Sequence, residues 1–267
     1  MFPSLTSTYR ALLRTAGAAA VAISLTGAAQ AQDYRSWTGF YVGLHGGYHW
    51  GGSSSLSLLP DEAAWAAISP DYAQFSGGTG GSVNDYIAGG QVGYNWRTGG
   101  FIVGLEADIA RTSVGTDVDR TTMVTEGLDT FPVRFQNAAE IDWLGTLRAR
   151  IGVTPFGTER VLLYVTGGLA YARVKTAHSL IDVDNASGYA GSSSGWEAGG
   201  TIGAGLEWGI GGGWTLKAEY LYYDLGDIKV HGEHVNNAAP PEYGTDAHYD
   251  LNGHIARLGV NYRIGGY

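Results

Sequence analysis

The stretch Trp214–Tyr223, with the sequence WTLKAEYLYY, alternates between apolar and polar side chains at every second residue. One face carries Trp214, Leu216, Ala218, Tyr220 and Tyr222, and the other carries Thr215, Lys217, Glu219 and Tyr223. Because successive side chains of a β-strand point to opposite faces, this period of two predicts a strand with unlike faces. The alternation recurs in seven further segments: Thr38–Trp50, Tyr86–Trp96, Phe101–Ala110, Ile141–Val153, Val161–Lys175, Trp196–Ile210 and Asn252–Ile264.

The composition of the faces indicates which side points outward. Glycines and charged residues share one face in almost every predicted strand, and the interior of an eight-stranded barrel has little room beyond side chains. Aromatic residues gather near the ends of the apolar face, where a membrane barrel has its interface girdles. We predict such a girdle from Phe40, Trp50, Trp96, Phe101, Trp143, Trp208, Trp214, Tyr222 and Tyr262. A secreted lipocalin-like barrel, with an apolar interior, has the same period and is the alternative.

The connections between the segments alternate strictly in length. Short ones lie at 97–100, 154–160 and 211–213, and long ones lie at about 51–85, 111–140, 176–195 and 224–251. Three short and four long links place both termini at the short-turn end, which is the plan of outer-membrane barrels and has no reason to occur in a lipocalin. The predicted fold is therefore all-β, an eight-stranded antiparallel up-and-down transmembrane β-barrel with extracellular long loops and periplasmic termini.

Composition excludes several classes of protein. The 267 residues include 43 glycines and 7 prolines, so glycine plus proline make up about 19%, below the roughly 25–30% of low-complexity chains. Cysteine is absent, which excludes a disulfide framework, thiolate metal ligands and a cysteine nucleophile. The formal net charge of -9 argues against a nucleic-acid partner.

The first residues have the pattern of a targeting sequence. Arg10 and Arg14 precede an apolar run over 16–25, and Ala29-Gln30-Ala31 follows as a small-residue cleavage site. We predict a signal peptide at 1–31 and a barrel domain at 32–267. The alternative is a membrane anchor, but the uncharged stretch 15–31 is just under the ~20 residues that span a bilayer.

Six motifs stand out in the predicted strands: WTGFYVG (37–43), VGLEAD (103–108), DWLGTLRAR (142–150), YVTGGLAY (164–171), LKAEYLYYDLG (216–226) and VNYR (260–263). Together they resemble the small outer-membrane immunogenic, porin-like barrels of Gram-negative bacteria. More distantly, the chain is similar to the transmembrane domain of OmpA. The resemblance implies insertion by the outer-membrane assembly machinery with periplasmic chaperones, contact with outer-membrane lipid and lipopolysaccharide, and surface display as an antigen, without naming a host ligand. Such barrels usually end on an aromatic residue, whereas here Ile264 takes that place and Gly265-Gly266-Tyr267 follows.

The inward face concentrates ionisable side chains, which we interpret as an interior polar network. The predicted members are Glu106, Asp108, Asp142, Arg148, Arg150, Glu197, Glu207, Lys217, Glu219, Arg257 and Arg263. Glu106 and Asp108 lie on the strand next to Arg148 and Arg150, so they can pair across the ladder. Lys217 and Glu219 have the same relation to Glu197 and Glu207. A network that fills the lumen is favoured, and a charge-lined pore is the alternative.

No motif indicates catalysis, a cofactor or a metal. The chain has no Gly-Lys dipeptide for a P-loop and no H-E-x-x-H motif. His254 lies on the apolar face without a serine on its strand, so an outer-membrane lipid-modifying enzyme is only a third interpretation. His231, Glu233, His234, Asp246 and His248 are interpreted as a solvated loop rather than a metal site. Pro60 and the following residues to Ile68 have the pattern of a short surface helix.

The sequence therefore predicts an outer-membrane barrel with a structural, surface-exposed role in the cell envelope and no enzymatic activity. A small-pore porin passing water, ions or small solutes is the alternative.

Overall fold

A computed structural model describes residues 37–60, 83–126, 129–155, 158–184, 186–235 and 245–264. It contains eight strands: β1 (Gly39–Pro60), β2 (Val83–Thr98), β3 (Phe101–Glu126), β4 (Asp129–Val153), β5 (Val161–Asp182), β6 (Ser187–Gly211), β7 (Trp214–Val235) and β8 (Thr245–Ile264). The predicted signal peptide, the tail after Ile264 and residues 61–68 of the predicted helix lie outside the described ranges. Pro60, its first predicted residue, is the last residue of β1. In the described ranges, no helix is long and apolar enough to cross a membrane.

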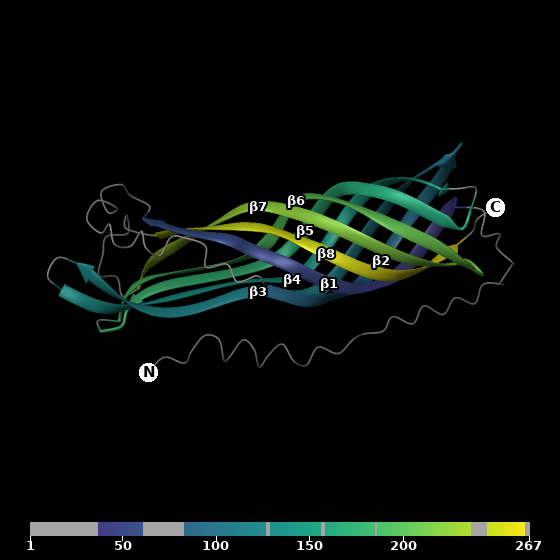
Figure 1. The fold of residues 1–267 in the computed structure, drawn as a ribbon. Coiled ribbons are helices and arrows are strands. Elements are labelled where there is room, and N and C mark those ends of the chain that lie inside the picture. The colour runs from purple at the N-terminus through teal and green to yellow at the C-terminus, as the bar shows by residue number, and fades with distance from the viewer. Residues whose placement is uncertain are drawn as a thin grey trace. The chain divides into compact units, whose positions relative to one another are not determined.

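The strands form one closed antiparallel ring in chain order, with β8 paired back to β1 (Figure 1). The predicted eight-stranded up-and-down barrel is confirmed. Directly paired residues can be followed once around the ring from Phe40 through Tyr94, Leu105, Ala149, Gly167, Ile202, Tyr222 and His254 to Trp50. The circuit returns to β1 ten residues further along (50 − 40 = 10), and strands with this stagger tilt by about 40° from the barrel axis.

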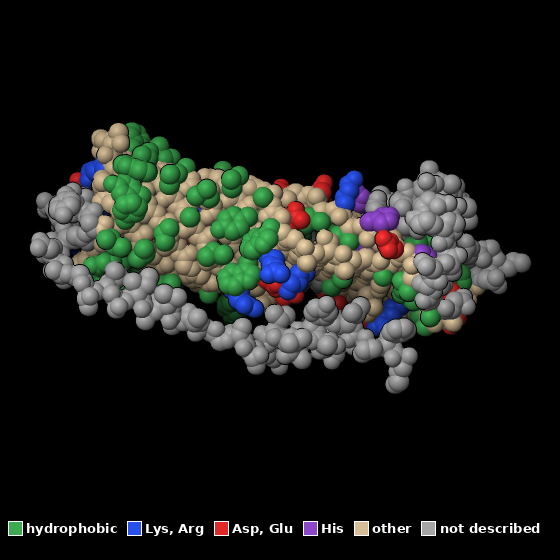
Figure 2. Space-filling view, turned by 180° about the vertical axis from the view of Figure 1, so that it is seen from behind, with side chains coloured by type: hydrophobic (Ala, Val, Ile, Leu, Met, Phe, Trp, Pro, Cys, Tyr) green, Lys and Arg blue, Asp and Glu red, His purple; other side chains and the backbone are tan. Residues whose placement is uncertain are grey.

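The outward face carries an apolar band between two rows of aromatic residues. Around the short turns lie Phe40, Tyr94, Trp96, Phe101, Trp208, Trp214 and Tyr262, and toward the other end lie Tyr48, Trp50, Tyr86, Trp143, Tyr171, Trp196, Tyr220 and Tyr222. Ten residues of a strand tilted by about 40° rise about 25 Å, the height of a membrane barrel's apolar band. Leu44 and Leu169, which lie between the rows, are 73% and 62% exposed. Figure 2 shows hydrophobic side chains covering one half of the wall and most charged side chains along the other.

The strands continue well beyond this band, so the predicted long loops are mostly strand. Only residues 127–128 separate β3 from β4, and 183–186 separate β5 from β6. In these extensions the pattern is inverted, with apolar side chains inward and polar ones outward. The inward residues include Val133, Phe135, Leu180, Val230, Tyr249 and Leu251, which are at most 2% exposed and belong to one apolar core.

One predicted orientation is wrong for a local reason. The sequence places Ile141 on the outer face with Trp143, but Ile141 is buried in the apolar core. The pairing of β4 with β5 skips Asp142, since Ile141 pairs with Val174 and Trp143 pairs with Arg173. Asp142 is thus an extra residue of β4 without a partner on β5, which makes a β-bulge. Because the side chains of a strand alternate between two faces, one extra residue turns those beyond the bulge to the opposite face.

Candidate functional site

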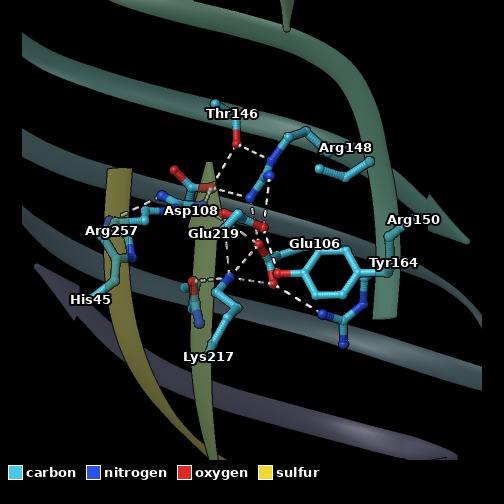
Figure 3. A network of polar contacts seen from close by, with 12 residues as sticks. His45, Glu106, Asp108, Thr146, Arg148, Arg150, Tyr164, Lys217, Glu219 and Arg257 are labelled. Carbon is cyan, nitrogen blue, oxygen red and sulfur yellow. Dashed lines mark hydrogen bonds and ion pairs between the residues drawn. The ribbon is translucent and has the colours of Figure 1, made fainter. Parts of the chain in front are cut away.

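Glu106 on β3 occupies the centre of the barrel interior (Figure 3). Its carboxylate accepts hydrogen bonds from Arg148 Nη2 at 2.5 Å and from Lys217 Nζ at 2.9 Å. The hydroxyl of Tyr41 donates a third hydrogen bond to it at 2.7 Å. Arg148 comes from the neighbouring strand β4, whereas Lys217 comes from β7 across the lumen. The ring of strands is therefore bridged through its middle by a buried carboxylate.

Asp108 and Glu219 extend these contacts to β8. Arg257 donates to Glu219 Oε2 from Nε at 2.7 Å and to Asp108 Oδ2 from Nη2 at 3.0 Å. Asp108 Oδ2 also accepts from Thr146 Oγ1 at 2.6 Å and from Arg148 Nη2 at 3.0 Å. Each carboxylate thus has both charged and neutral donors, which is the condition under which buried charges are tolerated.

A second group of contacts surrounds Glu207 on β6, nearer the short turns. Arg150 Nη1 lies 3.2 Å from Glu207 Oε2, and Arg150 Nε donates to Asn95 Oδ1 at 2.8 Å. The other oxygen of Glu207 accepts from Thr215 Oγ1 at 2.5 Å and Asn261 Nδ2 at 2.9 Å. This group joins the first one through Arg150, whose Nη1 is 3.5 Å from Glu106 Oε2.

Two tyrosine rings lie over glycines of the neighbouring strand, with which the tyrosines are directly paired. Tyr164 on β5 donates to Glu219 Oε1 at 2.8 Å, and a Cβ at Gly205 would lie 2.4 Å from its hydroxyl oxygen. A Cβ at Gly93 would lie 2.2 Å from the hydroxyl oxygen of Tyr41. The Arg150 guanidinium lies 4.6 Å from the ring centroid of Tyr41 and 5.2 Å from that of Tyr164. The space at these two glycines is therefore filled by a tyrosine side chain of the neighbouring strand.

The network is balanced in charge and lies between two groups of buried, mainly apolar side chains. Four cationic side chains (Arg148, Arg150, Lys217 and Arg257) face four anionic ones (Glu106, Asp108, Glu207 and Glu219). Toward the short turns lies an apolar cluster of Trp37, Ile102, Leu162 and Tyr164, in which Trp37 Nε1 donates to the Glu159 carbonyl at 2.9 Å. Toward the extensions, His49 Nε2 and the Tyr223 hydroxyl are 2.7 Å apart beneath the apolar core.

Three predicted members lie away from this network. Asp142, at the bulge, forms an ion pair with Lys175 at 2.5 Å. Glu197 is half-buried, in the interval between Ala190 and Gly200 where the pairing of β6 with β7 is interrupted. The Arg263 guanidinium lies 5.1 Å from the ring centroid of Trp37.

The sequence interpretation also missed neutral members of the network. They are Tyr41, His45, Gln91, Asn95, Thr146, Tyr164, Thr215 and Asn261. All of them lie on the inward face that the alternation defines, so the period of two already predicts that they point into the barrel. The sequence prediction includes only the Asp, Glu, Lys and Arg residues of that face.

The histidines considered above as metal ligands or catalytic residues lie in strand ladders or in the outer aromatic row. In the part of the chain that the structure describes, no group of three or more histidines and acidic residues could hold a metal ion. His231 pairs in the β7–β8 ladder with Asp246, and Lys229 pairs with His248, so this predicted loop is largely strand. His254 Nδ1 and the Tyr220 hydroxyl are 2.7 Å apart, and the His254 ring stacks on Trp50 with centroids 5.7 Å apart.

An apolar outer band, aromatic rows at both of its edges and a polar interior define a membrane-spanning β-barrel. The sequence matches the family "Outer membrane protein beta-barrel domain" over residues 18–263. It is 35% identical over 233 residues to the 31 kDa outer-membrane immunogenic protein of Brucella melitensis, covering 87% of this chain and 85% of that protein. The chain therefore belongs to the outer-membrane β-barrel family, and the predicted resemblance to immunogenic barrels is confirmed.

Two further proteins are similar. The 22 kDa outer membrane protein of Rhizobium leguminosarum bv. viciae is 29% identical over 194 residues, covering 71% of this chain and 64% of that protein. The crystal structure of OprG from Pseudomonas aeruginosa is 14% identical with a TM-score of 0.46, covering 88% of this chain and all of that one.

Proposed function

We propose that this protein is a closed structural barrel of the outer membrane that presents its strand extensions at the cell surface and does not conduct ions. The observation that carries the proposal is the network across the lumen. The side chains of Arg148, Glu106 and Lys217 are 0%, 2% and 1% exposed, and they connect strands on opposite sides of the ring. An ion crossing the lumen would have to separate these paired groups, each of which would then be buried without a partner.

The layers above and below the network support the same conclusion. Ions are strongly disfavoured in apolar surroundings. Trp37 and its neighbours cover the lumen toward the short turns, and the core that includes Phe135 and Leu180 fills it in the extensions. An ion would therefore encounter an apolar layer, the charged network and a second apolar layer in succession.

Planar-bilayer recording tests the proposal. The folded protein, identified by heat-modifiable migration on a gel, is expected to give no steady conductance, with a known porin as the positive control. Because both apolar layers remain in E106A/K217A, that variant alone should stay silent, whereas W37A/E106A/F135A/K217A, which also removes a large side chain from each layer, should produce a conductance. The matched variant R97A/E159A removes an ion pair at the short-turn end, where Arg97 Nη1 and Glu159 Oε2 are 2.9 Å apart, and should remain silent. A large steady conductance of the unmodified protein would overturn the proposal.

We propose further that the barrel is not an enzyme. His254, which lies on the apolar outer face, contacts Tyr220 and Trp50 as part of the aromatic row. Expression in a Gram-negative host followed by mass spectrometry of lipid A tests this directly. An unchanged lipid A spectrum is expected, and a new acylation or hydrolysis product would contradict the assignment.

For orientation, we propose that the strand extensions face outside the cell and that both ends of the mature chain lie in the periplasm. The short turns support this, because outer-membrane barrels have short periplasmic turns and longer external segments. Assembly would use the outer-membrane insertion machinery and periplasmic chaperones. Labelling of Lys229, an exposed residue of an extension, by a membrane-impermeant amine reagent on intact cells is expected, and labelling only after lysis would reverse the orientation.

A further inference from the structure

Arginine and tryptophan alternate across four neighbouring strands on the outer face of the barrel. Arg111 on β3 pairs directly with Trp143 on β4, Trp143 pairs with Arg173 on β5, and Arg173 pairs with Trp196 on β6. Directly paired residues of an antiparallel sheet point to the same face, and neighbouring strands are about 4.8 Å apart. The backbones carrying the two arginines are therefore only about 10 Å apart, with an indole between them and another beside them.

The side chains of this Arg-Trp row are available to an outside partner. Arg111, Arg173 and Trp196 are exposed, and Trp143 is half-buried beneath the Arg111 guanidinium, which lies 5.6 Å from its ring centroid. Among the residues that the structure describes, no carboxylate lies within ion-pair distance of either arginine. The acidic groups nearby are Asp142, paired with Lys175 at 2.5 Å, and the half-buried Glu140 and Glu197, of which Glu140 interacts electrostatically with Arg111 without forming an ion pair.

The row lies at the edge of the apolar band that is nearer the extensions. Arg173 is two residues beyond Tyr171, whose ring is 6.0 Å from that of Trp196. On the membrane side of the row, Ile109, Leu147 and Leu169 are 45%, 51% and 62% exposed. Figure 2 shows basic and acidic side chains beside hydrophobic ones where the apolar half of the wall ends. This is the depth of the lipid headgroups, where indole rings are favoured.

The basic residues at this edge lie on one side of the barrel. On β7, β8 and β1 the outward residues at the same edge include Tyr48, Trp50, Tyr220, Tyr222 and His254, with no lysine or arginine among them. On that side the aromatic residues anchor the barrel at the interface by themselves, so anchoring does not explain the two arginines of the row. An arginine at this depth costs little compared with one at the bilayer midplane, so these charges are tolerated at the edge of the band and remain available to an anion of the headgroup layer.

We propose that the Arg-Trp row is a binding site for a phosphate group of lipid A in the outer leaflet. A guanidinium donates two parallel hydrogen bonds to a phosphate, and two guanidiniums on alternate strands can hold one phosphate from both sides. The acyl chains of the same lipid lie on Leu147 and Leu169 below the row. The choice of lipid A over phospholipid rests on the proposed orientation, which places this edge in the outer leaflet.

Native mass spectrometry of the folded protein in detergent micelles tests the site. The probes are lipid A, the same lipid A without its phosphates, and phosphatidylglycerol. We expect lipid A to bind most tightly and R111Q/R173Q to lose at least about ten-fold in affinity for it, because two charge-assisted contacts are removed. R134Q/K229Q removes two positive charges from the extensions and should bind lipid A as the unmodified protein does. If R111Q/R173Q does not migrate as folded protein, the single variant R173Q is measured and should give a smaller loss.

Undiminished binding by R111Q/R173Q, equal binding of dephosphorylated lipid A, or equal loss in R134Q/K229Q would overturn the site. Equal or tighter binding of phosphatidylglycerol would overturn the choice of lipid A. Micelles have no sidedness and no ion gradient, so none of these results depends on whether the lumen conducts or which end faces outside. The bilayer recordings and the Lys229 labelling decide those points separately.

Discussion

Glu106 shows how a charge can be retained in the middle of a membrane protein. It receives hydrogen bonds from Arg148, Lys217 and the Tyr41 hydroxyl, and its own side chain is only 2% exposed. Removing one partner from such a set leaves the others buried and uncompensated, which costs more than the pair itself contributes.

We therefore predict that E106Q lowers the free energy of unfolding by about 3–5 kcal/mol. The amide retains the size of the side chain, so the loss reports on the charge. Urea titration in detergent micelles, followed by tryptophan fluorescence and gel migration, measures it. The control is E159Q, which disrupts an ion pair with Arg97 whose side chains are 35% and 32% exposed, and it should cost at most about 1 kcal/mol. Equal effects of the two variants would contradict the central role of Glu106.

The sequence predicts which residues face inward, but not which of them meet. Alternation alone places Glu106 and Lys217 inside, and strand order brings Glu106 beside Arg148. The contact between Glu106 and Lys217 joins β3 to β7 across the lumen, so it depends on the ten-residue stagger of the ring. That stagger is the sum of the pairing registers of the eight neighbouring strand pairs. The sequence of one strand alone determines none of these registers.

At the scale of the strand, the limit of the sequence prediction has one physical cause. Within the bilayer the strands are apolar outward, and in the extensions they are apolar inward, because water replaces hydrocarbon outside. The bulge at Asp142 reverses the orientation of β4 near this boundary, so Ile141 and Phe135 face the core although the period of two is unbroken on each side. The sequence prediction takes the apolar face to be the outer one along the whole strand, and it therefore assigns the extensions to loops.

The inverted pattern predicts that the extensions have a hydrophobic core of their own. Phe135 is fully buried in it, so F135A should lower stability by about 3–5 kcal/mol, as for other large-to-small core substitutions. Urea titration measures the loss, and limited proteolysis should find new cleavage sites in the extensions while the membrane part stays protected. The neighbouring Gln136 points outward, where its amide contacts Asp119 and Ser179, so Q136A should cost at most about 1 kcal/mol and open no new cleavage site. An F135A protein as stable and as protease-resistant as Q136A would show that the extensions are not held by this core.

At the scale of the whole molecule, the stagger sets the height of the membrane-facing band. Phe40 at the short-turn edge and Trp50 at the other edge are ten residues apart on one tilted strand, which gives a band of about 25 Å. A bilayer thicker than this band would have to thin or leave polar strand segments in hydrocarbon, and one much thinner would expose apolar side chains to water. Neither cost arises when the thickness of the hydrocarbon core equals the height of the band.

We therefore predict that folding from urea into preformed vesicles is most complete when the hydrocarbon core is about 25 Å thick. Phosphatidylcholines of increasing acyl-chain length, with one headgroup throughout, provide the series, and gel migration gives the folded fraction. L44N/L169N makes two membrane-facing residues polar and should lower the yield at every thickness without moving the optimum, since the distance between the aromatic rows is unchanged. An optimum at a core well above 30 Å would mean that the extensions also enter the membrane, and the division of the barrel into a lipid-facing and a water-facing part would then be wrong.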